Sequence, residues 1–207
     1  MHSEILSVKQ QELLTFITQF KRNFYLVGGT AVALYIGHRR SIDFDLFSFS
    51  KLNRLKIKYS ISKSGYKQSL IAEDIDQIHF ILNEVKITFF NYPFPVPHKE
   101  QLNSIISMPS LLSLAAMKAF ALGRRAKWKD YIDLYFIIRD FYTVQDISKE
   151  AETIFGQMFS EKLFREQLAY HKDIDYCEEV EFMGSFAINE RDIKEFLIDK
   201  ALQQNYL

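Results

Sequence analysis

"GGTAVALYIGHRRSIDFDLFS", residues 28–48, is the segment of this 207-residue chain from which we predict its fold. The apolar run NFYLVGG that leads into it predicts a short strand ending at Gly28 and Gly29. Thr30 is expected to cap a short helix, AVALYIG, which Gly37 ends. The segment SIDFDLFSF then alternates in polarity, which predicts a second strand.

The second strand carries two acids, Asp43 and Asp45, that fall on one face, whereas Ile42, Phe44 and Leu46 fall on the other. Residues i and i+2 of a strand lie roughly 7 Å apart along the backbone. Two carboxylates so placed are typical ligands of a hard divalent cation such as Mg²⁺. An isolated pair of this kind is more often a solvated surface feature, so the neighbouring residues decide between the two interpretations.

The neighbouring residues favour a phosphate site. Gly28, Gly29 and Thr30 stand at a helix start, where unpaired N–H groups and the positive end of the helix dipole suit an anion. Arg39 and Arg40 precede the acidic strand and have the donors to grip phosphate oxygens. The alternatives are that the glycines serve only a turn and that the arginines are a surface pair.

The rest of the chain indicates an α+β fold, in which a mixed-sheet core is followed by a helical C-terminal half. The first half has two more predicted helices and three more strands, at residues 3–21, 51–63, 66–73, 76–83 and 84–92. Asn83 and Glu84 are expected to form the last hairpin turn. Five helices follow, at residues 110–123, 127–141, 143–156, 160–171 and 189–204. We place the core at 1–97 and the helical region at 98–207, after the proline-rich connector 92–97.

The composition excludes several classes of protein. The net charge of +0 gives no overall field for nucleic acid, so a polyanion would have to meet a local patch. The lone Cys177 excludes an internal disulfide framework and predicts a cytoplasmic protein. Neither a signal peptide nor a run long enough to span a membrane is expected.

Three motifs carry a family resemblance. The first reads G-G-T-A-x-A-L, then G-H-R-x-S, then D-x-D-L-F-S, and the second is MKAFALGRRAKWKDYIDLYFII at 117–138. The tail LAYHKDIDYCEEVEFMG is a third and less specific segment. Together they resemble the AbiEii/AbiGii-type nucleotidyltransferase toxins of the polymerase-beta-like nucleotidyltransferase superfamily, and they cover most of the chain.

The resemblance implies a set of site residues. Nucleotide binding is assigned to the glycines, hydroxyls and arginines of the first motif, namely Gly28, Gly29, Thr30, Arg39, Arg40 and Ser41. Asp43 and Asp45 would hold two Mg²⁺ ions. Lys118 would contact phosphate, and Asp130 would help to position the base or the acceptor.

The second motif also has structural interpretations. Its alanines and leucines are typical of helix packing, and Asp130 with Asp133 could cap a helix or form a salt bridge. Four cations lie in the short connector between the two helices, which we call the basic connector: Arg124, Arg125, Lys127 and Lys129. This connector is either a solvated loop or a contact for an RNA backbone, with Trp128 available for stacking.

One feature of the superfamily is missing. Many members carry a third acid on a later strand, but the corresponding segment EVKITFFNYPF offers Lys86, Thr88 and Phe89 instead. Glu84 lies only at the edge of that strand, and His79 is interpreted as an ordinary strand residue. The absence leaves efficient two-metal catalysis in question.

The expected activity is Mg²⁺-dependent transfer of a nucleoside monophosphate from an NTP to a hydroxyl. The resemblance implies an acceptor in RNA, for example a tRNA 3′ end, or in a protein side chain. It also implies a toxin role with a cognate antitoxin as partner. The alternative is a catalytically degenerate member that binds nucleotide or a partner protein. A third reading, an RNA-binding module that uses the basic connector, is disfavoured by the neutral pI.

Overall fold

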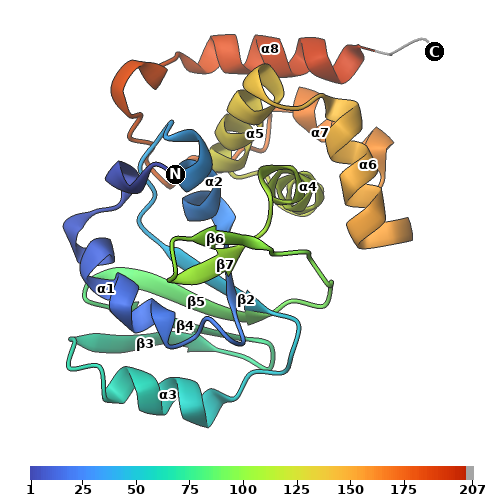
Figure 1. Cartoon of the computed structure of the whole chain (residues 1–207). Coiled ribbons are helices and arrows are strands. Elements are labelled where there is room, and N and C mark those ends of the chain that lie inside the picture. Colours follow the sequence, from blue (N-terminus) through green and yellow to red (C-terminus); the bar gives the residue numbers. More distant parts are fainter. Residues whose placement is uncertain (204–207) are drawn as a thin grey trace. The chain divides into compact units, whose positions relative to one another are not determined.

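The computed structural model describes residues 1–203 and separates into two compact units, Met1–Ser110 and Leu111–Leu207. Figure 1 labels the elements of both. The first unit contains a mixed sheet of seven strands, in the order β3-β4-β5-β2-β1-β7-β6. Its strands are β1 (Tyr25–Val27), β2 (Phe44–Ser48), β3 (Gln68–Glu73), β4 (Gln77–Leu82), β5 (Val85–Asn91), β6 (Glu100–Leu102) and β7 (Ile106–Met108). The predicted α+β class with a mixed sheet is confirmed.

The first unit also has three α-helices and one short 3-10 helix. These are η1 (Ser3–Ile5), α1 (Val8–Thr18), α2 (Gly28–Ile36) and α3 (Arg54–Ser62). The predicted helix at 3–21 is shorter in the structure because Ser7 starts it with a capping box. The Ser7 hydroxyl accepts from the Gln10 amide at 3.2 Å, and the Ser7 amide donates to Gln10 Oε1 at 3.0 Å.

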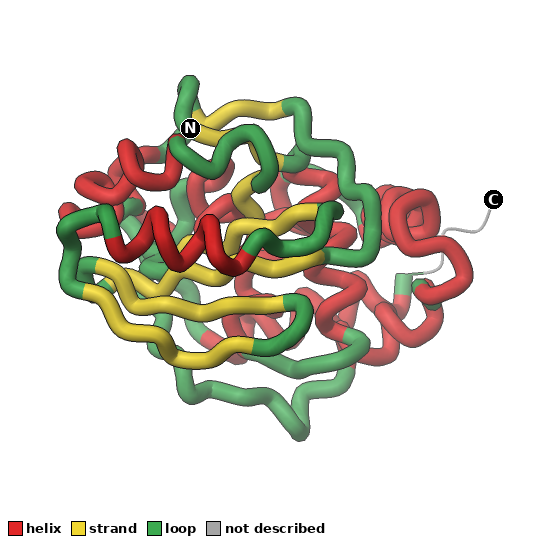
Figure 2. Tube along the Cα trace, turned by 90° about the horizontal axis from the view of Figure 1, so that it is seen from below, coloured by secondary structure: helices red, strands yellow, loops and turns green. Residues whose placement is uncertain are grey.

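The sheet brings distant segments together through parallel pairings. β2 pairs with β5 in parallel and with β1 in antiparallel orientation, so it lies inside the sheet. Figure 2 shows the strands running side by side. The hairpin between β4 and β5 turns at Asn83 and Glu84, both with positive φ (50° and 64°), as predicted.

One face of the central strands forms the apolar core of the first unit. Its buried side chains include Phe44 and Leu46 of β2 and Ile87 and Phe89 of β5. Phe20, beyond the end of α1, packs edge-on against Phe89 with ring centroids 4.8 Å apart. Because strand side chains alternate, Asp45 of β2 and Thr88 of β5 are left on the opposite face.

The sequence did not predict β6 and β7. Both strands are only three residues long and follow the proline-rich connector, so they carry no periodic signal. β7 pairs in parallel with β1 through Tyr25 and Ser107, which places residues 98–110 in the first unit. The boundary between the units therefore follows Ser110, whereas the boundary predicted from the sequence follows residue 97.

The second unit is helical. Its elements are α4 (Leu111–Leu122), α5 (Trp128–Asp140), α6 (Val144–Phe155), η2 (Gly156–Met158), α7 (Glu161–Ala169), η3 (Gly184–Phe186) and α8 (Glu190–Leu202). All five predicted helices are present, although Gln204, the last residue of the helix predicted at 189–204, lies outside the described residues. None of the helices in residues 1–203 is long and apolar enough to cross a membrane.

Candidate active site

The first unit places Asp45 against the start of α2. Asp45 pairs with Val27, the last residue of β1, so its carboxylate lies beside the next residue, Gly28. A Cβ atom added at Gly28 would lie 2.2 Å from Asp45 Oδ2, and the φ of Gly28 is +74°. Glycine at this position therefore serves both the backbone conformation and the close approach of the carboxylate.

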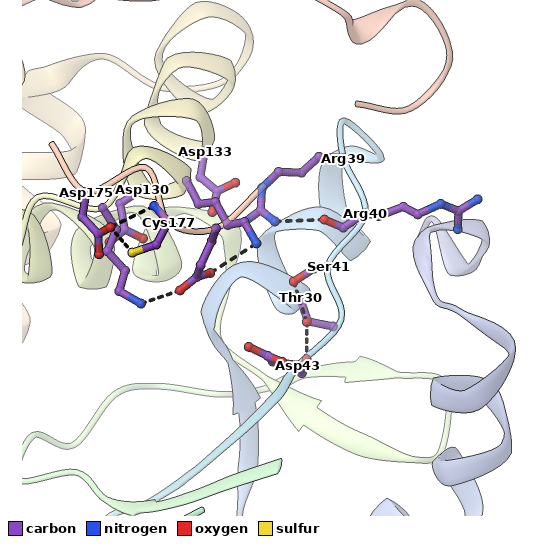
Figure 3. Close-up of polar contacts among 12 residues, drawn as sticks. Thr30, Arg39, Arg40, Ser41, Asp43, Asp130, Asp133, Asp175 and Cys177 are labelled. Carbon is purple, nitrogen blue, oxygen red and sulfur yellow. Dashed lines mark hydrogen bonds and ion pairs between the residues drawn. The ribbon is translucent and has the colours of Figure 1, made fainter. Parts of the chain in front are cut away.

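Asp43 lies one residue before β2, so it adjoins the strand that carries Asp45. The hydroxyl of Thr30 donates to the backbone carbonyl of Asp43, and it lies 2.9 Å from the Ser41 hydroxyl. Figure 3 shows both hydrogen bonds. Thr30, 2% exposed, thus ties α2 to the segment that delivers Asp43.

Two local expectations were wrong. Thr30 does not cap α2, because the helix already begins at Gly28 and Val27 is its N-cap. Ile42 does not join the buried face of Phe44 and Leu46, since it is 61% exposed. It precedes the first residue of β2, where the alternation of a strand no longer applies.

Arg39 lies near the same helix start. It is 1% exposed, and its Nη2 atom would lie 2.4 Å from a Cβ atom added at Gly29. Its Nη1 donates to the carbonyl of Arg40 at 3.0 Å. The second glycine of the motif therefore makes room for a guanidinium group. Arg40 itself is half-buried.

In the second unit Lys118 lies between two acids of α5. Its Nζ is 2.5 Å from Asp130 Oδ1 and 2.7 Å from Asp133 Oδ2. All three side chains are buried, with exposed fractions of 9%, 3% and 0%. Asp130 and Asp133 therefore do form a salt bridge with Lys118, and a salt bridge was one of the two structural interpretations of these acids. Asp133 was not among the predicted site residues, although its spacing of three from Asp130 on a helix could have indicated it.

Lys129, predicted to lie in the basic connector, lies in the first turn of α5, and Lys127 is the N-cap of that helix. Each of the four cations has a contact within the second unit. Lys127 Nζ lies 2.5 Å and Lys129 Nζ 3.2 Å from the carboxylate of Glu178. The hydrogen bond from Lys127, which has the largest effect, and the one from Lys129 together lower the pKa of Glu178 to about 2. This ion pairing therefore stabilises the unit above pH ~4.5, and its contribution is lost as the pH falls toward 2.

The remaining cations and Trp128 are also engaged. The Arg124 guanidinium lies 3.6 Å from the centroid of the Phe120 ring, and Arg125 Nε is 3.3 Å from Asp130 Oδ2. Trp128 is 9% exposed and lines a cavity of about 300 Å³ with Tyr176 and Glu190. The connector is thus a partly neutralised surface rather than a run of free charges.

Comparison with known proteins identifies the family of this chain. The family described as "Nucleotidyl transferase AbiEii toxin, Type IV TA system" matches residues 56–207. The chain belongs to this family. It is therefore a nucleotidyltransferase of the AbiEii type. The family match begins after the segment 28–48, so the assignments of Asp43 and Asp45 rest on the geometry above.

The chain is also similar to one protein in sequence and to two solved structures in fold. "Uncharacterized protein aq_aa25" of Aquifex aeolicus (strain VF5) is 33% identical over 141 residues, which are 65% of this chain and 68% of that protein. MenT4, a nucleotidyltransferase toxin from Mycobacterium tuberculosis H37Rv, has a similar fold, with a TM-score of 0.63 at 13% identity over 94% of this chain and 81% of MenT4. JHP933 from Helicobacter pylori has a TM-score of 0.53 at 13% identity, over 95% of this chain and 91% of JHP933.

The glycine that adjoins Asp45 offers a first test of this candidate site. Gly28→Ala should lower the free energy of unfolding by about 1–3 kcal/mol through its left-handed φ. It should also lower nucleotidyl transfer, because the new methyl group displaces the Asp45 carboxylate. Chemical denaturation and a transfer assay measure the two effects separately.

Gly65→Ala is the matched control. Gly65 has nearly the same φ, +76°, but a Cβ atom there would meet nothing within 4 Å. This variant should lose stability and keep its transfer activity. Full activity of Gly28→Ala would remove Gly28 and Asp45 from the site.

Proposed function

We propose that the chain transfers a nucleoside monophosphate from an NTP to a hydroxyl of an RNA acceptor, as the toxin of a pair with an antitoxin protein. The observation that carries this proposal is the position of the Asp45 carboxylate beside Gly28, with Asp43 tied to α2 through Thr30. A helix N-terminus, a nearby guanidinium and two carboxylates suit a triphosphate that arrives with a cation.

The donor set fits Mg²⁺ brought in with the nucleotide. Among residues 1–203 no three or more His, Cys, Asp or Glu side chains gather into a metal site. Mg²⁺ commonly uses one or two carboxylates together with substrate phosphates, which is what Asp43 and Asp45 can offer. Mg²⁺ held there would neutralise charge on the phosphates as the acceptor oxygen replaces pyrophosphate at the α-phosphorus.

The residues of the chain have separate roles in this proposal. The amides at the start of α2, from Gly28 and Gly29, would bind the triphosphate, and Arg39 and Arg40 would supply counter-charge. Thr30 and Ser41 act indirectly, since the Thr30 hydroxyl bonds to the backbone at Asp43 and also contacts the Ser41 hydroxyl. Lys118 and Asp130 are assigned to phosphate and to the acceptor or base by family resemblance, and their ion pair would then have to exchange partners on binding.

The direct test is label transfer. Purified protein is incubated with each α-³²P-labelled NTP, Mg²⁺ and total RNA, and the labelled species are separated on a gel. A labelled RNA supports the proposal, and a labelled protein band identifies a protein acceptor instead. Binding of NTP and Mg²⁺ without any labelled product would favour the alternative of a degenerate protein that only binds nucleotide. That alternative is supported by the residue opposite Asp45 on β5, which is Thr88 and not a third acid.

The basic connector provides a test of RNA as the acceptor. Arg124→Ala with Lys127→Ala should raise the KM for RNA and leave NTP binding nearly unchanged. The log–log dependence of RNA binding on salt should flatten by roughly 0.7–0.9 for each phosphate contact removed. Filter binding over a range of salt concentrations measures the slope.

Glu178→Gln is the complementary variant. It removes the carboxylate that holds Lys127 and Lys129, so it should strengthen RNA binding and steepen the salt dependence. Slopes that stay the same in both variants would make the basic connector a solvated loop without a role in docking RNA.

A further inference from the structure

The pairing of three strands places a hydroxyl and an imidazole in line with Asp45. On β5, Thr88 is the residue directly opposite Asp45, and on β4, His79 is directly opposite Thr88. Paired residues of neighbouring strands point to the same face of a sheet. Asp45, Thr88 and His79 therefore form one row across the face that carries the proposed site.

A hydrogen bond joins two members of this row. His79 Nδ1 lies 3.1 Å from Thr88 Oγ1, and Thr88 is 7% exposed. Thr88 lies on the strand where many members of the superfamily carry a third acid and this chain carries none. A hydroxyl with a hydrogen-bonded imidazole behind it can accept and pass on a proton, which a lone threonine cannot do at neutral pH.

Burial and the neighbouring charges favour the neutral form of the His79 ring, which is the form that can accept a proton. Burial lowers the pKa of His79, Lys86 on β5 lowers it further, and Asp45 on β2 opposes them. The neighbour on β3 is Ala72, which does not titrate, and Glu73 pairs with the buried Ile78 and contacts Lys58 of α3. The net direction leaves His79 neutral at pH 7.

We propose that Thr88 and His79 take the place of the third acid and receive the proton of the attacking hydroxyl. As the acceptor oxygen bonds to the α-phosphorus and pyrophosphate leaves, the acceptor proton passes to Thr88 Oγ1, and the Thr88 proton passes to His79 Nδ1. His79 becomes an imidazolium ion and later returns its proton to solvent. This inference rests on the proposed function, since it assigns the proton of that same reaction.

The test compares two variants that separate hydrogen bonding from proton transfer. His79→Asn keeps an oxygen able to accept from Thr88 but cannot take up a proton, and Thr88→Val removes the hydroxyl at nearly constant volume. Each should lower kcat about 10²- to 10⁴-fold, the usual contribution of a general base. The Kd for NTP with Mg²⁺, measured by calorimetry, should stay unchanged.

Two further readouts distinguish this role from a structural one. The double variant should lose no more activity than either single variant, because both residues serve one step. In the wild type kcat should fall at low pH, with a midpoint below the ordinary histidine value of about 6.5, and His79→Asn should abolish this limb. Adding Thr88→Asp to His79→Asn should restore part of the activity, because a carboxylate can take the proton itself.

Gln77→Ala is the control on the same strand and face, and it should leave kcat and its pH dependence unchanged. Wild-type kcat in His79→Asn, or a parallel loss of NTP binding and thermal stability, would overturn the inference while the transfer activity stands. Absence of transfer by the wild-type protein would instead overturn the proposed function and this inference together.

Discussion

Replacing Asp43 and Asp45 together with asparagine is expected to abolish transfer of label from NTP, by at least about 10³-fold in kcat. The change removes both negative charges that would hold Mg²⁺ and leaves the shape of the side chains nearly the same. The thermal shift produced by NTP with Mg²⁺ should disappear as well, and thermal unfolding with and without the ligands measures it.

The double variant should remain folded. Neither acid is needed for the apolar core, which lies on the other face of β2 at Phe44 and Leu46. Loss of two neighbouring carboxylates also relieves their mutual repulsion. An unchanged response to NTP and Mg²⁺ in this variant would reject the carboxylate pair as the metal site.

Lys118→Met is expected to cause the largest loss of stability, about 3–5 kcal/mol in the free energy of unfolding. The ammonium group of Lys118 neutralises Asp130 and Asp133, and all three groups are buried. Without it two buried carboxylates remain close together, and the half-exposed Arg125, 3.3 Å from Asp130, is the cation left in contact with Asp130. Denaturation by urea, followed by circular dichroism, measures the change.

Two variants make this test specific. Lys162→Met on α7 removes an exposed lysine whose Nζ is 3.9 Å from Glu166, so it should change stability by less than ~1 kcal/mol. Asp133→Asn added to Lys118→Met should restore part of the loss, because one buried charge is removed. If Lys118→Met instead keeps its stability and loses transfer, a phosphate contact becomes the better assignment for Lys118.

Much of the fold could be predicted from local signals in the sequence. Asn83 and Glu84 form the expected turn, and Gly37 ends α2 with a φ of 77°. The predicted helices of the second unit are all present, because caps and apolar periodicity act within a few residues of the chain. Thr143, for instance, begins α6 with a capping box that involves Asp146.

The failed cap at Thr30 and the two strands that the sequence did not predict both depended on contacts between distant segments. Thr30 has the residue type of a helix cap, but its hydroxyl bonds to Ser41 and to the carbonyl of Asp43. The strands β6 and β7 are too short to show a pattern and exist because β7 pairs with β1. Secondary-structure propensity depends only on the residues of one segment, so it cannot predict which distant segment that segment will contact.

The candidate site divides in the same way. Local motifs were enough to identify the glycine pair, the two acids of one strand and the lysine and aspartate of the second motif, because these motifs are contiguous or lie on neighbouring helices. The contacts between these residues could be found only in the folded chain: Asp45 lies beside Gly28, Lys118 bridges Asp130 and Asp133, and Thr88 and His79 lie in one row with Asp45. Strand register and buried ion pairs are set by packing between segments far apart in the chain, and no local pattern records the partner.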